Sequence, residues 1–291
     1  MKMGIISEEK DWVVNELKKS MEKNGIKPEI IKPSNIISGI NIDFRLKCNN
    51  KNLLDLDCAF VRNIGDEVEM FHRFDFLKHL EHYIPLINPL DGIENAGNKY
   101  RCSFLMDLKN IPQPKTVVTE SIDEALEWVN TFEDCVIKPL FGNQGRGIIR
   151  INGGSLISKL NKLTEFKKKY GSFYIQEFVK NPNNVYRDIR AFVVGDEVVS
   201  AMYRVSDNWI TNIHQNAKPE ECEINEEIEE LAIKAKDALG LVYAGVDLIE
   251  GRKGLKVLEV NATPSWEGLS KISKTNIADR IIEEVVNLLK R

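Results

Sequence analysis

Two apolar segments near the end of the chain carry oxygen-bearing side chains that could hold a metal ion. We expect residues 242–265, VYAGVDLIEGRKGLKVLEVNATPS, to form a hairpin whose turn centres on Lys253. That register places Asp247 directly across from Glu259, with Asn261 on the same face two residues further on. Opposed carboxylates on apolar strands repel each other, and Mg²⁺ compensates them because it takes carboxylate, amide and phosphate oxygens together. The alternative is that one carboxylate faces solvent or pairs with a basic residue of the turn.

A lysine followed by closely spaced glycines marks residues 136–148, VIKPLFGNQGRGI. Lys138 lies on an apolar strand, and Gly142, Gly145 and Gly147 follow it. Glycines let a backbone approach phosphates closely, and a lysine on a rigid strand supplies a fixed positive charge. The Walker pattern needs Gly-Lys-Ser/Thr before a helix, whereas this loop leads into another strand. We interpret the loop as a flap that closes over a triphosphate; the alternative is an ordinary glycine-rich hairpin with a solvated lysine.

The strand end YIQEFV has groups that suit a nucleobase. Its backbone can offer N–H and C=O groups to an adenine edge, while an apolar side chain packs on the ring. The alternative is an ordinary strand end. The residues concerned are Gln176, Glu177, Phe178 and Val179.

The largely apolar hairpin that follows also carries charged residues. Asp188, Arg190 and Arg204 could bind the ribose and phosphates of a nucleotide, and an arginine could stabilise charge on a transferred phosphoryl group. Each of them could instead belong to the solvated face of the hairpin.

Alternating strands and helices must position these residues. The first β-α-β unit predicts a small parallel sheet, but no G-x-G-x-x-G follows its first strand, so it is not a dinucleotide site by this criterion. We expect α/β and α+β architecture in three parts: 1–95, 96–179 and 180–291. The expected strands are MGIIS, PEIIK, DCAFVRNIG, SFYIQEFV and the hairpin RDIRAFVVGDEVVSAMYRVS, which turns at Gly195–Asp196. The expected helices are one from Trp12 to the Asn24–Gly25 stop, then 93–109, 122–132, 224–239 and 276–290.

Composition limits the classes of partner and the compartment. The formal net charge of -4 gives no bulk attraction to nucleic acid or to an anionic membrane, so a basic site must be local. Apolar stretches fall short of the roughly 18 residues of a membrane span. The five cysteines lie far apart without a C-x-x-C pair, which argues against a zinc site and a secreted disulfide framework. We therefore expect a cytoplasmic protein that binds a small anionic ligand.

The ordered set of motifs resembles the RimK-like branch of the ATP-grasp ligases over nearly the whole chain. The matching segments are Asn98–Lys99, VIKPLFGNQGRGI, YIQEFV, DIRAFVVGDEVV, Arg204, TNIHQNA, AGVDLIEG and LEVNATPSWEGL. The resemblance implies an ATP-grasp fold, in which an N-terminal pre-ATP-grasp α/β domain precedes two ATP-grasp lobes that close on ATP between two antiparallel sheets. Two stretches depart from the usual pattern near the expected acceptor pocket, Ile210–Asn212 and Ser265–Trp266.

The resemblance also implies a role for each matched residue. ATP phosphates would contact Lys99 and Lys138, and adenine would be bound by Gln176 to Val179, with Glu177 and Asp188 near the nucleoside. The phosphoryl-transfer centre would contain Arg190 and Arg204, with Asn212 beside them. Two Mg²⁺ or Mn²⁺ ions would be held by Asp247, Glu259 and Asn261.

The implied reaction has two steps. A carboxylate attacks the γ-phosphate of ATP to give an acyl phosphate, and an amine then displaces phosphate to form an amide. Lysine, arginine and divalent metal would neutralise the triphosphate and the attacking oxygens. A closed glycine flap would exclude the water that hydrolyses an acyl phosphate.

The implied partners are L-glutamate and a small-molecule carboxylate acceptor. The sequence is most similar to methanogen-type members that add glutamate to a coenzyme, with tetrahydromethanopterin as the first expected acceptor and a deazaflavin coenzyme tail as the second. Ribosomal protein tails and carrier proteins are further acceptors within the family. Arg62 and His214 are candidates for the acceptor side, or else a surface arginine and a hydrogen-bonded histidine. Related enzymes commonly form homo-oligomers, and a phosphotransferase or a non-catalytic nucleotide-binding module are the alternative functions.

Overall fold

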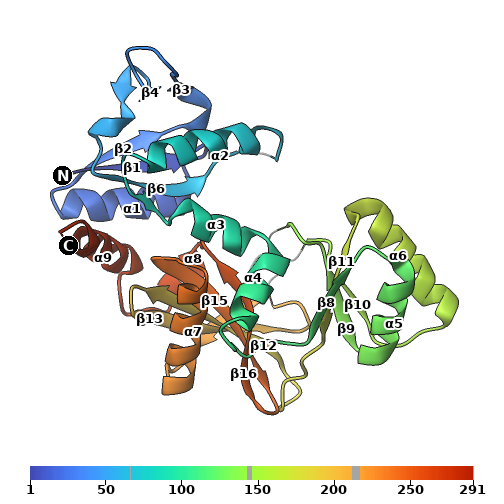
Figure 1. Ribbon diagram of the computed structural model, residues 1–291. Coiled ribbons are helices and arrows are strands. Elements are labelled where there is room, and N and C mark those ends of the chain that lie inside the picture. The colour runs from blue at the N-terminus through green and yellow to red at the C-terminus, as the bar shows by residue number, and fades with distance from the viewer. Residues whose placement is uncertain (66, 143–145, 212–216, 291) are drawn as a thin grey trace.

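The computed structural model describes residues 1–65, 67–142, 146–211 and 217–290, with the side chains of residues 67 and 68 left aside (Figure 1). Its strands form four sheets, and each sheet lies within one of the three parts expected from the sequence. Helices from different parts also pack against one another, so the division at 95 and 179 stays a prediction.

The first part contains a parallel sheet of order β2-β1-β6-β7, as the β-α-β pattern predicted. Asp11 begins the first helix because its carboxylate accepts a hydrogen bond from the N–H of Val14. The elements of this part are β1 (Lys2–Ser7), α1 (Trp12–Lys23), β2 (Lys27–Ile31), η1 (Pro33–Asn35), β3 (Ile36–Ser38), β4 (Leu46–Cys48), β5 (Lys51–Asn52), η2 (Leu53–Asp55), β6 (Cys58–Asn63), α2 (Glu67–Glu81) and β7 (Leu86–Ile87). Strands β3, β4 and β5 form a separate small antiparallel sheet.

The single helix expected at 93–109 is divided into two helices in the structure, so the prediction of one continuous helix was wrong. α3 (Leu90–Gly97) and α4 (Lys99–Asp107) meet at Asn98. The side chain of Asn98 accepts hydrogen bonds from the N–H groups of Tyr100 and Arg101 and therefore starts a new helix.

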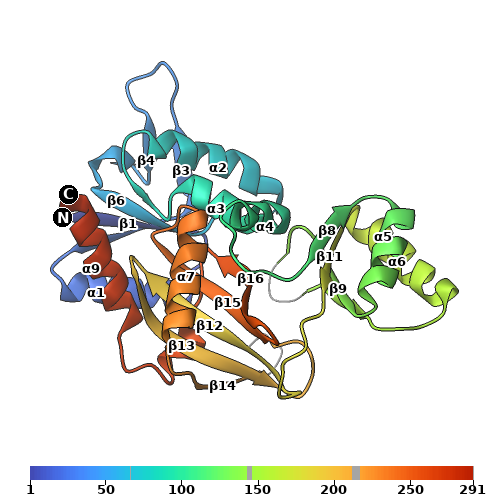
Figure 2. The same cartoon turned by 60° about the horizontal axis from the view of Figure 1, so that its bottom comes forward.

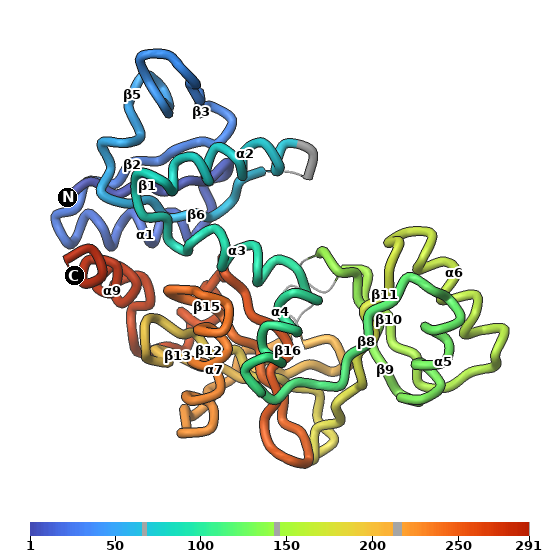
Figure 3. The backbone as a smooth tube through the Cα atoms, in the orientation of Figure 1, coloured from blue at the N-terminus to red at the C-terminus, as the bar shows by residue number. Residues whose placement is uncertain are grey.

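The second part contains an antiparallel sheet of four strands and two helices, and it stands apart from the rest of the molecule (Figure 1). It has its own apolar core, which includes Ile137, Phe166 and Phe173. Its strand order is β10-β9-β11-β8. The elements are β8 (Thr116–Thr119), α5 (Ile122–Phe132), β9 (Cys135–Lys138), β10 (Ile149–Ile151), α6 (Leu156–Tyr170) and β11 (Phe173–Glu177). Figure 3 shows how the chain enters this sheet after α4 and leaves it after β11.

The third part contains an antiparallel sheet of five strands in the order β14-β13-β12-β15-β16. The first hairpin turns at Gly195–Asp196 as predicted, because Val194 pairs with Glu197. The elements are β12 (Tyr186–Val194), β13 (Glu197–Ser206), β14 (Lys218–Glu221), α7 (Glu226–Ala238), β15 (Tyr243–Gly251), β16 (Gly254–Asn261), α8 (Glu267–Ser270) and α9 (Ile277–Lys290).

The two faces of the five-stranded sheet have different cover. Helices α4 and α7 pack on one face (Figure 2). On the other face, one end of the sheet packs through Phe192 and Tyr243 against a core that also includes side chains of α1, β1 and α9. The remaining end of that face carries charged residues and faces the four-stranded sheet. None of the helices in the described ranges has the length and apolar character needed to cross a bilayer.

Candidate functional site

A pocket of about 360 Å³ lies between the four-stranded and the five-stranded sheets. Both sheets contribute to it, so residues far apart in the sequence meet there. The predicted site residues that line the pocket are Lys138, Gln176, Glu177, Phe178, Val179, Asp188, Arg204, Asp247 and Glu259. Lys99 and Arg190 lie beside the pocket, because they contact Glu259 and Asp247, which line it.

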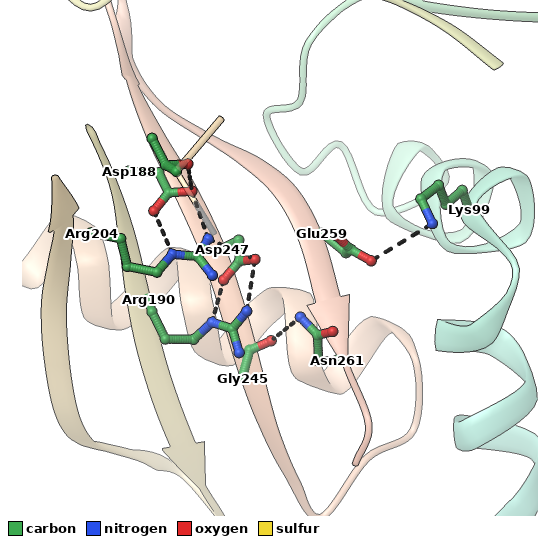
Figure 4. A network of polar contacts seen from close by, with 9 residues as sticks. Lys99, Asp188, Arg190, Arg204, Gly245, Asp247, Glu259 and Asn261 are labelled. Atoms are coloured by element: carbon green, nitrogen blue, oxygen red, sulfur yellow. Dashed lines mark hydrogen bonds and ion pairs between the residues drawn. The ribbon is translucent and has the colours of Figure 1, made fainter. Parts of the chain in front are cut away.

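Asp247 is the centre of a buried ion network on the five-stranded sheet (Figure 4). Arg190 donates to both of its oxygens, with 2.9 Å between Nη2 and Oδ2. Arg204 lies 2.9 Å from Asp247 and also donates to both oxygens of Asp188, at 2.7 and 2.6 Å. Thr211 donates to Asp188 at 2.6 Å. The two predicted catalytic arginines are therefore joined through one carboxylate.

The two carboxylates of this network have opposite shifts of pKa. Burial raises the pKa of Asp188 more than the single facing arginine, Arg204, lowers it. Burial acts in the same direction on Asp247, but Arg190 and Arg204 together outweigh it and lower the pKa of this carboxyl. Asp247 is thus held ionised by two cations.

The predicted pairing of Asp247 with Glu259 is confirmed, although the turn differs from the expected one. Gly251 pairs with Gly254, so the turn has two residues and centres between Arg252 and Lys253. A shift in register between Asp247 and Leu248 then restores the expected pairing.

Glu259 and Asn261 lie next to Asp247 but contact other groups. The carboxylate of Glu259, whose side chain is 35% exposed, lies 3.8 Å from the ammonium of Lys99. The Asn261 amide donates to the Gly245 carbonyl at 3.4 Å. Carboxylate and amide oxygens on neighbouring strands suit a magnesium ion in ligand type. Within the described ranges, the side chains of His, Cys, Asp and Glu form no group of three that could hold a metal. The predicted metal ligands are therefore brought together, while their role as ligands stays a prediction.

Lys138 projects from β9 into the pocket and has an amide as its partner. Its ammonium donates to Oε1 of Gln176 at 2.8 Å. Burial lowers the pKa of Lys138 to about 8, because desolvation disfavours the charged form. A polyphosphate would supply the negative charge that this lysine lacks.

The strand end predicted to bind adenine has mixed surroundings. The Gln176 side chain is buried and also donates to Thr116 at 3.2 Å, so it supports Lys138 from within the sheet. Glu177 forms an ion pair with Lys256 of β16 at 2.5 Å, which links the two sheets. Phe178 and Val179 line the pocket and leave an apolar surface for a base. Adenine binding stays a prediction.

Lys99 connects Gly142, where the glycine loop begins, to Glu259 on β16. Lys99 at the start of α4 donates to the carbonyl of Gly142 at 2.9 Å. Gly147 has φ +75°, and a Cβ there would lie 2.2 Å from the hydroxyl of Tyr170. Three candidate residues lie outside the described residues, namely Gly145, Asn212 and His214.

Sequence reasoning missed two pocket residues near Phe178. Arg150 places its guanidinium 3.4 Å from the centre of the Phe178 ring and is held by Asp134 through two 2.8 Å hydrogen bonds. Trp209 meets the same ring edge-on at 6.5 Å. A basic residue directly after the glycine loop was the available signal for Arg150.

Asn88 was also missed, and it fixes the strands that carry the predicted metal ligands. Its side chain is fully buried and forms four hydrogen bonds to the backbone of Val242, Tyr243 and Ala262, at 2.6 to 3.1 Å. These groups belong to the ends of β15 and β16, next to Gly245 and Asn261. Every donor and acceptor of the amide is used, so Asn88 holds the two strand ends in one geometry.

Comparisons with known proteins agree with this geometry. Residues 96–285 match the family model described as the RimK-like ATP-grasp domain. The chain is 63% identical over 290 residues to the tetrahydromethanopterin:alpha-L-glutamate ligase of Methanococcus maripaludis, covering 100% of this chain and 99% of that protein. It is 58% identical to the ligase of the same name from Methanocaldococcus jannaschii, over 100% of both chains.

A solved structure shows the same fold at low identity. The ATP-grasp ligase PsnB, in complex with a minimal precursor, Mg and ADP, superposes with a TM-score of 0.76 at 16% identity, covering 99% of this chain and 98% of that one. The family match spans well over half of the chain, and the relatives span all of it. The chain therefore belongs to the RimK-like ATP-grasp family.

Proposed function

We propose that the protein is an ATP-dependent ligase that joins L-glutamate to a carboxylate of tetrahydromethanopterin through an amide bond. The observation that carries the choice of substrates is the 63% identity over the whole chain to a ligase of that name. The pocket between the two sheets supports the use of ATP, because it combines an apolar end with a group of cations and carboxylates.

The residues of the pocket fit a metal–nucleotide complex. Lys138 and Lys99 would hold the phosphates. Among the described residues, the hydrogen-bond partner of Lys138 is the amide of Gln176 and not a carboxylate. Lys99 links Gly142 of the glycine loop to Glu259. Asp247, Glu259 and Asn261 would provide oxygen ligands to magnesium or manganese. When bound, such an ion neutralises phosphate oxygens and orients the transferred group.

The chain's own residues explain how both steps of the reaction proceed. Arg190 and Arg204, which share Asp247, would stabilise the negative charge as a substrate carboxylate attacks phosphorus and ADP leaves. Gly142, where the glycine loop begins, accepts a hydrogen bond from Lys99, and the loop would limit access of water to the acyl phosphate. The amine of glutamate then attacks the acyl carbon, and phosphate leaves.

Mass spectrometry of the product tests the proposal. The protein is incubated with ATP, Mg²⁺, L-glutamate and, in separate reactions, tetrahydromethanopterin, a deazaflavin coenzyme with its tail, a ribosomal protein tail or a carrier protein. We expect one glutamyl unit to be added to tetrahydromethanopterin. Addition to another acceptor alone would keep the ligase and replace its substrate.

Isotope transfer separates the ligase from a phosphotransferase. An acceptor carboxylate labelled with ¹⁸O passes one labelled oxygen to the released phosphate only if an acyl phosphate forms. A phosphorylated acceptor, with no labelled phosphate released, would overturn the ligase proposal. ATP binding without turnover of any acceptor would favour a non-catalytic module.

A further inference from the structure

Arg62, at the carboxyl end of β6, has an unusual set of partners. Its Nη2 donates to the carbonyl of Pro264 at 3.0 Å, and its Nη1 donates weakly to the hydroxyl of Tyr243 at 3.4 Å. The guanidinium lies 5.9 Å from the centre of the Trp266 ring. Its Nε atom is buried and has no hydrogen-bond partner among the described residues. All of these contacts are neutral.

Arg62 therefore differs from the other arginines around the site. Arg190, Arg204 and Arg150 each face a carboxylate at hydrogen-bond distance. Among the side chains that the structure describes, no carboxylate pairs with Arg62 within 4.0 Å, and its contacts are those with Pro264, Tyr243 and Trp266. A half-buried cation with neutral partners loses hydration that only an anion restores fully. Each Nη atom has two hydrogens, of which one is used, so the fork can still receive a carboxylate.

The position of Arg62 relates it to the reaction centre. A Cβ built on Gly245 would lie 2.9 Å from Nη1 of Arg190 and 3.0 Å from Cβ of Pro264, so these two groups are neighbours. Pro264 in turn accepts a hydrogen bond from Arg62. Arg190 and Arg62 thus both lie near Pro264. The carboxyl ends of the strands in a parallel sheet are also where ligands of α/β folds bind.

We propose that Arg62 binds a substrate carboxylate that does not take part in bond formation. The proposal rests on the proposed function, because it concerns the substrates of the same site. L-Glutamate carries two such carboxylates, and the acceptor can carry another besides the one that reacts. Arg62 is then a specificity-determining residue that holds the anionic end of one substrate beside Pro264 while the reacting end lies near Arg190.

Equilibrium binding tests the proposal without turnover. L-Glutamate and tetrahydromethanopterin are titrated separately by calorimetry into wild type, Arg62→Met and Arg62→Lys, each with Mg²⁺ and a non-hydrolysable ATP analogue. We expect Arg62→Met to weaken one of the two substrates about ten- to hundredfold, since a hydrogen-bonded ion pair is lost. The affinity of Arg62→Lys for that substrate should fall between those of wild type and Arg62→Met, because lysine keeps the charge and loses the two-pronged guanidinium geometry. The substrate that weakens identifies the source of the carboxylate.

Two controls separate a binding role from a structural one. The ATP analogue should bind all variants within about twofold of wild type. Arg73→Met is the matched control, because Arg73 also has a buried Nε without a partner but lies 3.7 Å from Glu8. It should leave the affinity of both substrates unchanged. For wild type itself, glutamine in place of glutamate shows whether the side-chain carboxylate is the one bound.

The outcomes distinguish this proposal from the proposed function. Equal binding of both substrates to wild type and Arg62→Met overturns the role of Arg62, even if wild type makes the product. The role of Arg62 is also overturned if Arg62→Met weakens the binding of both substrates and of the nucleotide equally and Arg73→Met does the same. Failure of wild type to bind either substrate would overturn it as well. Loss of substrate binding in Arg62→Met, combined with no product from wild type, would keep the carboxylate site and reject the proposed reaction.

Discussion

The two sheets that enclose the pocket handle charge differently. On the five-stranded sheet, Asp188, Arg190, Arg204 and Asp247 are paired with one another in a buried network. On the four-stranded sheet, Lys138 has the amide of Gln176 as its one hydrogen-bond partner among the described residues, and burial lowers its pKa to about 8. The first set of charges is compensated by hydrogen-bonded ion pairs, whereas Lys138 is attracted by Glu259 and Asp247 only at longer range.

The difference indicates what each sheet contributes to the site. A compensated network keeps its side chains in place whether or not a ligand is bound, so it provides a fixed reaction centre. A lysine without a hydrogen-bonded carboxylate gains stabilisation when phosphates arrive, so it would add affinity for the nucleotide. Four substitutions break or sharpen this comparison, and they follow from the largest expected effect to the smallest.

Asp247→Asn removes the carboxylate that joins Arg190 to Arg204. Buried Arg204 and half-buried Arg190 then lose a counter-charge, and we expect a loss of about 3–5 kcal/mol in the free energy of unfolding together with loss of product formation. Urea denaturation measures the first effect. The matched control is Asp134→Asn, which breaks a more exposed pair with Arg150 and should cost clearly less. Equal losses in both variants would contradict the buried network.

Glu259→Gln tests the partly exposed carboxylate of the five-stranded sheet that lies next to Lys99. The side chain is 35% exposed, so the free energy of unfolding should change by less than about 1 kcal/mol. Turnover should fall by a factor of about 10²–10³, because the proposed metal ligand loses its charge. Glu220→Gln, an exposed change on β14, is the control for activity. Wild-type rates in Glu259→Gln would reject the assignment of Glu259 as a metal ligand.

Asn88→Ala loosens the strand ends next to the reaction centre. It leaves four backbone groups without their partner, and we expect a loss of about 3 kcal/mol in the free energy of unfolding. If Asn88 positions the metal ligands, the Mg²⁺ concentration for half-maximal turnover should also rise. Asn95→Ala removes a single 3.3 Å hydrogen bond to Leu239 and serves as the control. An unchanged Mg²⁺ requirement in folded Asn88→Ala would limit the residue to a structural role.

Lys138→Met tests the buried charge on the four-stranded sheet. We expect the nucleotide affinity to fall about ten- to hundredfold, as measured by calorimetry at pH 7. In wild type the affinity should also fall as the pH rises through about 8, because the lysine then loses its proton and its attraction for phosphates. Lys138→Met should lack this step in its pH dependence, while Lys162→Met on the exposed face of α6 should keep it. A pH-independent affinity of wild type between pH 7 and 9 would contradict the role of Lys138.

The same lysine links stability to pH. Its pKa of about 8 in the folded protein lies below the ordinary value near 10.5, so the unfolded chain binds more protons between these limits. The free energy of unfolding should therefore rise with pH from about 8 to 10.5 through this group. Lys138→Met should remove this contribution and be more stable than wild type below pH 8.

Local patterns in the sequence were enough to predict most elements of the fold. Helix α5 was predicted with its observed bounds, and the hairpin turn at Gly195–Asp196 is as expected, because periodicity and turn residues act over short distances. The break at Asn98 was missed because an asparagine inside a helical pattern is also compatible with one continuous helix. Capping became evident only from the backbone geometry.

Other features depend on contacts between distant residues. The pairing of Asp247 with Glu259 was predicted from a turn centred on Lys253, but the structure reaches it through a shorter turn and a shift in register. The four hydrogen bonds of Asn88 join residues more than 150 positions apart, so a local pattern does not reveal them. Many of the residues that line the pocket could thus be predicted from their types and spacing, whereas their supporting contacts could not.

A crystal structure with Mg²⁺ and a non-hydrolysable ATP analogue tests the central claim most directly, namely that the pocket between the two sheets binds the triphosphate. The account predicts phosphate oxygens within hydrogen-bond distance of Lys99 and Lys138, with metal ions held by Asp247, Glu259 and Asn261. A nucleotide bound elsewhere, with Lys138 still donating only to Gln176 and no ion next to these oxygens, would contradict it.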